Sequence, residues 1–402
     1  MNLLFLSLGR YETLKVSDIY VDLLREFIKH GHKVYILSPV DKHSDGKKMV
    51  IEEEGCTIIR VYTGKIQKTN IIEKGINTIL IEYRFLKAAE KYLSSVKFDL
   101  VLYPTPPITF VKVVEYIKKR DRAKTYLLLK DIFPQNAVDL GMLKKTGLKG
   151  MLYRYFRTKE KRLYAVSDRI GCMSPANRQY VLDHNPEVVP DRVEVCPNSI
   201  EVRDMSIGAE ERERIRIKYG LPLDKKIFVY GGNLGRPQGI PFIIDCLRTQ
   251  LDNPDVFFLI VGDGTEYHKL EAFLDEARPS NMLLMQRLPK EDYDHMIAAC
   301  DVGLIFLDYR FTIPNFPSRL LAYMQAKLPV LACTDTATDI GKLIVENKMG
   351  WLCASNNIKN FDFMVKQILS TDLKHFGENA FRLLNNEYTV LKTIKKILKN
   401  NE

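Results

Sequence analysis

Short apolar segments alternate with longer amphipathic segments along nearly all of the 402-residue chain. Strand and helix patterns that alternate in this way need crossover connections, which bring the strands into a parallel sheet. Helical patterns cover Ser17–His30 and Ile108–Arg120, for example, and Gly31 follows the first of them, where a left-handed C-cap belongs. In the front half we expect strands at 2–8, 33–38, 57–62, 99–103, 124–129, 169–173 and 192–195.

The same pattern then starts again, with expected strands at 226–231, 256–261, 282–285, 302–306, 329–332 and 350–353. Two runs of similar length predict an α/β protein with two doubly wound, Rossmann-like domains that face each other across a cleft. The boundary is expected near Asn198–Glu210, where Pro, Asn, Ser and Gly break the periodicity. We therefore expect a first domain over 1–200, a second over 201–385, and a final helix over 386–402 that packs back toward the first domain.

Composition narrows the class of protein further. Apolar residues make up 46% of the chain and charged residues 27%, which argues against a mainly disordered protein. The seven cysteines are widely scattered, so the sequence lacks a Cys-x-x-Cys motif and does not favour a disulfide framework. We expect a cytoplasmic protein whose N-terminal apolar run is a strand, not a signal peptide, and which contains no bilayer-spanning segment.

The segment 311–330 contains a candidate phosphate site. A loop ends at Pro317-Ser318 and a helix is expected to continue to about Lys327. The free N–H groups of Ser318, Arg319 and Leu320 would then point outward at the positive end of the helix dipole, where an anion binds without a metal. An ordinary capped helix explains the same residues equally well.

Two glycine-rich loops follow expected strands. The first contains Gly231-Gly232, Arg236 and Gly239, and the second contains Gly262 and Gly264. Glycines after a strand let the backbone approach a ligand closely, and a guanidinium such as that of Arg236 binds phosphate oxygens in a forked geometry. The first loop matches neither the dinucleotide nor the nucleoside triphosphatase fingerprint, and a tight turn accounts for either loop taken alone.

These segments occur in the order found in the GT-B glycosyltransferases. The Gly9 loop, Gly31–Val34, Pro197-Asn198, Gly231–Gly239, Val261–Gly264 and Pro317–Val330 together resemble glycosyltransferase family 4, within its bacterial surface-polysaccharide subgroup. The resemblance implies two facing domains, a nucleoside diphosphate sugar as donor and a lipid-linked glycan as acceptor. It places the following residues at the donor: Gly9, Gly232, Asn233, Arg236, Gln238, Gly262, Gly264, Arg287, Pro317, Ser318, Arg319 and Leu320.

The chain also departs from the family pattern. Pro314 and Ala322 stand where the family has two glutamates, and Asn233 and Gln238 stand where it has Arg and Lys on the first glycine-rich loop. Arg236 is expected to take over as the cation.

The resemblance also implies catalytic roles. Lys130 and Asp131 fall where the family has His-Asp, so the implied catalytic residues are Asp131, Lys130 and Arg236. The resemblance implies retention of anomeric configuration, with Asp131 orienting the acceptor or stabilising an oxocarbenium ion. A turn or helix-cap role is the alternative for Asp131. We expect no cofactor and no metal, because the loops lack an Asp-x-Asp pair or a cluster with metal-ligand spacing. UDP-linked sugars are the donors suggested by the subgroup.

A basic segment lies at 143–164. Residues 1–200 carry 34 Lys and Arg against 23 Asp and Glu, whereas residues 201–402 carry 26 against 27. Apolar residues at helical spacing accompany the cations, so an amphipathic helix at an anionic inner-membrane surface is one interpretation. The other is a helix packed on its own domain with a solvated basic face. The cations expected at the membrane are Lys144, Lys145, Lys149, Arg154 and Arg157. Nucleic acid is a weaker candidate partner, since no recognition module accompanies the charge.

Two other functions stay open at this point. One is a nucleotide-sugar epimerase, or a phosphorylase, of the same two-domain form, for which the sequence shows no obvious His and carboxylate set. The other is a non-catalytic partner subunit that binds a glycan, which the missing signature glutamates allow.

Overall fold

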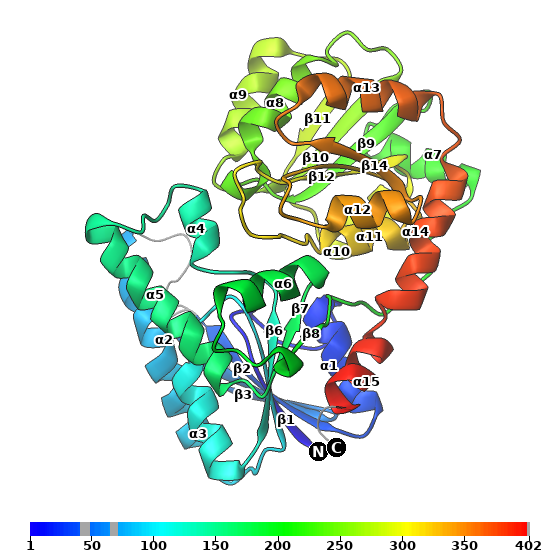
Figure 1. Cartoon of the computed structure of the whole chain (residues 1–402). Helices are drawn as coiled ribbons and strands as arrows, with labels where there is room; N and C mark the ends of the chain where they lie inside the picture. Colours follow the sequence, from blue (N-terminus) through cyan, green and yellow to red (C-terminus); the bar gives the residue numbers. More distant parts are fainter. Residues whose placement is uncertain (41–48, 65–70, 400–402) are drawn as a thin grey trace. The chain divides into compact units, whose positions relative to one another are not determined.

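A computed structural model describes residues 1–40, 49–64 and 71–399, with the backbone alone for 71–79. The chain divides into two compact units (Figure 1). The first unit comprises Met1–Ile200 and the chain from Val390 onward, and the second comprises Glu201–Thr389. Each unit is a mainly parallel sheet covered by helices, so the predicted α/β class with two Rossmann-like domains is confirmed.

The first unit contains an eight-stranded sheet in the order β3-β4-β2-β1-β5-β6-β7-β8. Its strands are β1 (Asn2–Leu6), β2 (Lys33–Val40), β3 (Val50–Glu53), β4 (Cys56–Tyr62), β5 (Leu100–Pro104), β6 (Lys124–Leu129), β7 (Arg169–Cys172) and β8 (Val193–Val195). Its helices are α1 (Ile19–Lys29), α2 (Ile71–Tyr92), α3 (Val111–Asp121), α4 (Gln135–Asp139), α5 (Gly147–Val166), α6 (Pro175–His184), the 3-10 turn η1 (Pro190–Arg192) and α15 (Val390–Lys399).

Alternate residues of β1 enter different cores on the two faces of this sheet. Leu4 and Leu6 join the cluster covered by α2, α3, α5 and α6. Leu3 and Phe5 join the cluster covered by α1 and α15, two helices that lie side by side in Figure 1. A strand covered on both faces has no solvent side, which explains why its sequence is continuously apolar.

Helix α1 shows why the predicted boundaries hold. The Asp18 carboxylate accepts hydrogen bonds from the N–H groups of Tyr20 and Val21, at 2.8 and 2.7 Å, which caps the first turn. Gly31 follows the helix with a φ of 78°, a left-handed conformation that glycine adopts without steric cost.

The second unit contains a six-stranded sheet in the order β11-β10-β9-β12-β13-β14, in which neighbouring strands are parallel. Its strands are β9 (Lys226–Asn233), β10 (Val256–Asp263), β11 (Met282–Met285), β12 (Val302–Phe306), β13 (Val330–Thr334) and β14 (Gly350–Ala354). Its helices are α7 (Ala209–Lys218), the 3-10 turn η2 (Arg236–Gln238), α8 (Ile240–Arg248), α9 (Tyr267–Ala277), α10 (Lys290–Ala298), α11 (Arg319–Gln325), α12 (Ile340–Glu346), α13 (Ile358–Leu369) and α14 (Lys374–Glu387). Helices α8, α9 and α13 share one core with the sheet, and α10, α11 and α12 lie on its other face (Figure 1).

Strand β3 is not among the predicted strands. Its four residues, Val50–Glu53, pair antiparallel with β4 at the edge of the first sheet. Two of the four are glutamates, so an edge strand of this kind lacks the apolar run that marks the central strands. In the described part of the chain, no helix is both long and apolar enough to cross a membrane.

Candidate functional site

Each sheet has one point where the strand order reverses. In the second unit this point lies between β9 and its neighbour β12, and in the first unit between β1 and β5. Ligands of open parallel sheets bind beyond the carboxyl ends of the strands at such a point. The loops that follow β9 and β12 therefore frame the candidate site of the second unit.

Arg319 lies at the carboxyl end of β9. Its guanidinium carbon is 4.2 Å from the ring centroid of Tyr230. A Cβ atom built on Gly232 would lie 3.3 Å from Nη2 of Arg319, so the cation lies directly against the glycine-rich loop. Nη1 of Arg319 is buried and has no hydrogen-bond partner among the described residues. A buried donor without an acceptor is costly, and a phosphate oxygen bound here would satisfy it.

The start of helix α11 differs from the prediction in one respect. The N–H of Leu320 donates to the carbonyl of Pro317 at 3.2 Å, within a tight first turn. The expectation that this N–H is free to bind phosphate is therefore wrong. The helix also ends at Gln325, two residues before the predicted end. Ser318 is its N-cap and adopts helical backbone angles.

The glycines of the second loop have a structural reason of their own. A Cβ atom on Gly262 would lie 1.9 Å from the carbonyl oxygen of Gly232, and one on Gly264 would lie 2.3 Å from that of Leu234. Both glycines therefore let the loop after β10 pack directly on the loop after β9. Their proposed contact with a nucleotide remains a prediction.

Gln238 organises the first glycine-rich loop. Its buried side-chain oxygen accepts hydrogen bonds from Nδ2 of Asn233 at 3.0 Å and from the N–H of Gly235 at 3.1 Å. The two residues that replace the family's Arg and Lys thus bond to each other. This bond ties the two ends of the turn together before any ligand is present.

Arg236 lies at the surface of the same loop. Its side chain is 55% exposed, and Nε is 3.7 Å from the carboxylate of Glu266, which also pairs with Lys269 at 3.0 Å. An exposed pair at this distance constrains the guanidinium weakly. Arg287 is exposed two residues beyond β11.

Sequence reasoning missed a second arginine at the reversal point. Arg310 lies just beyond β12 and binds the buried Asp308 carboxylate through Nε at 2.8 Å and Nη2 at 2.7 Å. The N–H of Asp308 donates to the carbonyl of Pro237, which joins the loops after β9 and β12. An Asp-x-Arg sequence in a loop carries no signal that distinguishes this pair from any other surface pair.

Asp131 follows β6 in the first unit. The Thr105 hydroxyl oxygen accepts from the N–H groups of Lys130 and Asp131, at 3.0 and 3.2 Å, and donates to the Asp131 carbonyl at 3.0 Å. Both carboxylate oxygens of Asp131 accept from Asn136 of α4. Burial raises the pKa of Asp131 to about 6, against the opposing effect of these hydrogen bonds. Asn136 was not among the predicted residues.

The Lys130 side chain contacts residues other than those that surround the Asp131 carboxylate. Its Nζ donates to the carbonyl of Cys196 at 3.2 Å, and the side chain lines a small cavity with Tyr20 and Asn198. Burial lowers the pKa of Lys130 to about 8. Although adjacent in sequence, Lys130 and Asp131 thus have different side-chain partners.

The Gly9 loop follows β1 at the reversal point of the first sheet. Ser38 of β2 donates to the Gly9 carbonyl at 2.8 Å, and the Gly9 N–H donates to the Ser7 hydroxyl at 2.9 Å. A Cβ atom at Gly9 would lie 2.7 Å from the hydroxyl oxygen of Tyr11. A larger residue here would displace the buried Tyr11 ring, and the contact of Gly9 with a donor remains a prediction.

Comparison with known proteins identifies the family. The family model described as Glycosyltransferase Family 4 matches residues 18–204, and the model described as Glycosyl transferases group 1 matches residues 211–383. Between them the two models cover most of both units. The chain is a glycosyltransferase with a Family 4 domain followed by a group 1 domain.

Curated relatives of this chain are also described as glycosyltransferases. A probable glycosyltransferase, WbjE, from Pseudomonas aeruginosa is 24% identical over 82% of this chain and 80% of its own length. A putative colanic acid biosynthesis glycosyl transferase, WcaI, from Escherichia coli K12 is 24% identical over 61% of this chain and 60% of its own length.

Solved structures share the fold of the glycosyltransferase. A sucrose-phosphate synthase from Thermosynechococcus elongatus aligns with a TM-score of 0.77 and 14% identity, over 99% of this chain and 97% of its own. HepE from Anabaena, solved in complex with UDP-glucose, aligns with a TM-score of 0.68 and 14% identity, over 99% and 98%. The predicted GT-B fold is thereby confirmed.

Helix α5 of the glycosyltransferase presents an apolar stripe to solvent. Leu148, Met151, Leu152 and Tyr155 recur at the spacing of one helix face, with Leu148 87% exposed and Met151 60% exposed. Met142 precedes the helix and is also exposed. We call these five residues the α5 stripe.

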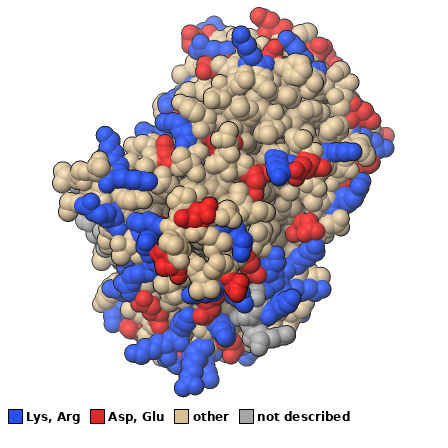
Figure 2. All heavy atoms as spheres, viewed as in Figure 1, with Lys and Arg blue, Asp and Glu red and all other residues tan. Residues whose placement is uncertain are grey.

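Cations surround the α5 stripe. Lys144, Lys145, Lys149 and Arg154 are exposed around it, and Figure 2 shows Lys and Arg side chains gathered over this part of the first unit. Arg157 differs from the other four predicted cations, because it pairs with Glu160 at 2.6 Å and donates to the His184 carbonyl.

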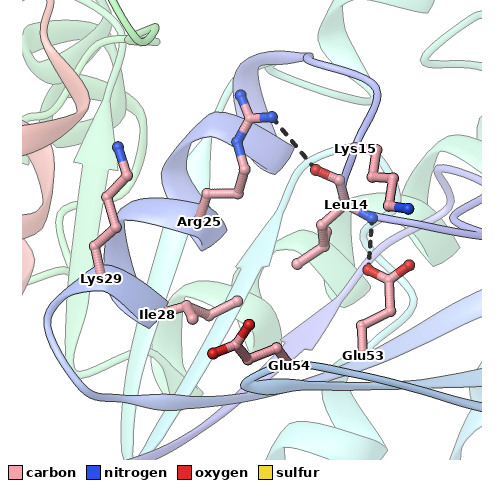
Figure 3. Close-up of a pocket in the computed structure, with 7 residues that line it drawn as sticks. All are labelled: Leu14, Lys15, Arg25, Ile28, Lys29, Glu53 and Glu54. Carbon is pink, nitrogen blue, oxygen red and sulfur yellow. Dashed lines mark hydrogen bonds between the residues drawn. The ribbon is translucent and has the colours of Figure 1, made fainter.

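An open pocket of about 480 Å³ lies elsewhere in the first unit (Figure 3). Arg25 and Lys29 of α1 line one side, and Glu53 and Glu54 line the other. The N–H of Leu14 donates to the Glu53 carboxylate at 3.0 Å across it. None of the lining residues is a predicted site residue.

Proposed function

We propose that this enzyme is a retaining glycosyltransferase of bacterial surface-polysaccharide synthesis. The donor is a UDP-linked hexose or N-acetylhexosamine, and the acceptor is a lipid-linked glycan. The relatives support the pathway, since WcaI is described as a putative colanic acid biosynthesis enzyme and TuaC of Bacillus subtilis as a putative teichuronic acid biosynthesis enzyme. The UDP complex of the structurally similar HepE supports the choice of donor.

The observation that carries the proposal is the position of Arg319. Its guanidinium lies against Gly232 at the reversal point of the second sheet, and one of its nitrogens is buried with no acceptor in the described part of the chain. Breaking the anomeric bond develops negative charge on the diphosphate. A cation already held in place stabilises that charge without reorganisation in the transition state. Arg319 is thus the main diphosphate ligand, and the more exposed Arg236 is a second cation at the rim.

Metal independence is part of the proposal. Two arginines at one loop supply the positive charge that a divalent ion supplies in other nucleotide-sugar enzymes. In the described residues, no group of three His, Cys, Asp or Glu side chains could hold a metal ion. Full activity in excess EDTA is the expected result, and loss of activity that Mg²⁺ or Mn²⁺ restores would contradict this part.

Asp131 is the proposed acceptor-side residue. An ionised carboxylate at the carboxyl edge of β6 can accept a hydrogen bond from an acceptor hydroxyl or stabilise an oxocarbenium ion. In the retaining scheme the leaving phosphate removes the acceptor proton, so Asp131 orients and stabilises more than it abstracts a proton.

A donor screen tests the function. The purified protein is incubated with UDP-, GDP-, ADP- and dTDP-sugars and a lipid extract containing polyprenyl diphosphate glycans, and the release of nucleoside diphosphate is measured. We expect release from a UDP-sugar that depends on the extract. Proton NMR of the anomeric position in the product then shows whether configuration is retained.

The other outcomes separate the alternatives. Conversion of a UDP-sugar to its epimer without an acceptor would indicate an epimerase. Failure to bind any of the four nucleoside diphosphates at millimolar concentration would indicate a non-catalytic partner subunit. Either result would overturn the proposal.

We also propose that the α5 stripe lies in the anionic surface of the inner membrane, on its cytoplasmic face. An exposed apolar stripe of five side chains loses contact with water when it enters the interface. The four surrounding cations add about 1 kcal/mol each near anionic lipid. This arrangement would bring a lipid-linked acceptor to the enzyme by diffusion along the surface.

A further inference from the structure

Tyr230 contacts both halves of the proposed diphosphate site. Its ring lies 4.2 Å below the guanidinium of Arg319. Its hydroxyl donates a hydrogen bond of 2.7 Å to the carbonyl of Asn233, three residues further along the same glycine-rich loop. The side chain is 1% exposed, so neither contact competes with bulk water. One buried residue thus joins the cation to the loop that the cation faces.

Without the Tyr230 ring, the Arg319 guanidinium would be poorly positioned. An arginine side chain has many rotamers, and ordering it at the moment of binding opposes affinity. The face of an aromatic ring attracts a guanidinium and fixes its plane, more strongly when both groups are desolvated. No hydrogen bond fixes the position of Nη1 of Arg319, because this atom has no partner among the described residues.

The backbone below the site is held by another tyrosine. The Tyr323 hydroxyl accepts from the N–H of Gly231 at 3.2 Å and lies 3.1 Å from the carbonyls of Val229 and Leu304. Strands β9 and β12 are therefore tied together independently of Tyr230. Removing the Tyr230 side chain should change the cation more than it changes the strands.

We propose that Tyr230 is a positioning residue for the donor diphosphate, because its ring holds the Arg319 guanidinium at Gly232 while its hydroxyl holds the loop at Asn233. The inference rests on the proposed function, since it presumes that the diphosphate binds at Arg319. Because the Tyr230 side chain is buried, we assign it no direct contact with phosphate. Its effect on the donor passes mainly through Arg319, and the hydroxyl contact with the loop at Asn233 contributes the smaller part.

A double-mutant cycle with UDP as the probe tests this assignment. Calorimetry measures UDP affinity for the wild type, Tyr230→Leu, Arg319→Ala and the double variant. We expect Tyr230→Leu to weaken UDP binding by roughly tenfold in the wild-type background and by less than twofold in the Arg319→Ala background. Tyr230→Phe keeps the ring and should recover most of the affinity. Uridine, which has no phosphates, should bind the wild type and Tyr230→Leu equally.

Phe258→Leu is the matched control. Phe258 is buried in the same core on the neighbouring strand β10, so its truncation costs similar packing without touching Arg319. Thermal unfolding of both variants checks that the fold is kept. A fall in UDP affinity with Phe258→Leu equal to that with Tyr230→Leu would show a general packing effect and overturn the inference.

The outcomes also separate this inference from the proposed function. If Arg319→Ala binds UDP as well as the wild type, the proposed donor site itself is wrong. If Arg319→Ala weakens binding but Tyr230→Leu does not, the donor site stands and the positioning role of Tyr230 is overturned. If Tyr230→Leu lowers UDP affinity equally in the wild-type and Arg319→Ala backgrounds, Tyr230 does not act through Arg319 and the inference is overturned.

Discussion

Nδ2 of Asn136 donates to both carboxylate oxygens of Asp131, at 2.9 and 2.8 Å. Burial raises the pKa of Asp131 to about 6, and these hydrogen bonds favour the ionised form. If the ionised carboxylate acts on the acceptor, the rate should fall with acid at an apparent pKa near 6. Asn136 then sets the pH range in which the enzyme works.

Replacing Asn136 by Ala should move the acid limb of the pH–rate profile to higher pH. A hydrogen bond to a charged group is worth about 1.5–3 kcal/mol, which corresponds to a shift of about one pH unit or more. The measurement is nucleoside diphosphate release from pH 5 to 9 under saturating donor. Gln135→Ala in the same helical turn is the control, because Gln135 binds Asp139 instead. An unchanged limb in Asn136→Ala would remove Asn136 from this role.

Asp131→Asn should stabilise the folded protein at pH 8 while it lowers activity. With a folded pKa near 6, above the unfolded value, the ionised carboxylate destabilises the folded state by about 3 kcal/mol at pH above 6. The gain from the substitution should shrink as the pH falls from 6 to 4. Urea unfolding of both proteins across this range measures the difference.

Asp168→Asn should have the opposite effect on the stability of the folded protein. Burial alone would raise the pKa of Asp168, but hydrogen bonds from Lys118 and Thr125 hold it below its usual value. Its ionised form therefore stabilises the folded state, and Asp168→Asn should destabilise the protein at pH 8. Equal signs for the two variants would contradict the assigned environments.

Arg236→Ala should lower turnover at least tenfold with little change in stability. The side chain is 55% exposed and its ion pair with Glu266 is long, so its loss costs at most about 1 kcal/mol of folding free energy. Initial rates and the thermal unfolding midpoint are the two measurements. Lys269→Ala, which removes the other cation beside Glu266, should keep wild-type turnover. Wild-type turnover in Arg236→Ala would remove Arg236 from the mechanism.

Met151→Glu should weaken binding to anionic vesicles. The substitution places a charge in the exposed apolar face of α5, where it repels phosphatidylglycerol and stays hydrated. Co-sedimentation with vesicles that contain 30% phosphatidylglycerol, against pure phosphatidylcholine, measures the loss. Ile217→Glu, on α7 of the second unit, is the control, since Ile217 is 63% exposed but lies outside the α5 stripe. Equal binding by wild type and Met151→Glu would contradict the membrane proposal.

The fold was predictable because its signal is local and repeated. Residues 302–306 form a run without a charge and lie fully buried in β12, so periodicity alone marks this strand. Strand β3 was not predicted because Glu52 and Glu53 interrupt its apolar pattern. Charged residues are tolerated there because β3 is an edge strand that pairs on one side only. The end of α1 was predictable because Gly31 follows the helix and adopts the left-handed conformation that ends it.

The sequence predicts which segments form the candidate site, but it predicts few of the contacts between their side chains. The sequence indicates a helix start at Ser318-Arg319 and a cation at Arg236, yet it cannot tell which guanidinium lies against Gly232. That contact depends on how α11 packs on β9, which is a tertiary relationship. The hydrogen bond within the turn at Leu320 and the partnership of Asn136 with Asp131 are likewise set by backbone geometry that no residue pattern encodes.

A crystal structure of the protein with UDP would show whether Arg319 binds the diphosphate. We expect a diphosphate oxygen within hydrogen-bonding distance of the Arg319 guanidinium, about 3 Å, beside the backbone of Gly232. UDP bound with its phosphates away from Arg319, at any other place on the molecule, would contradict this expectation.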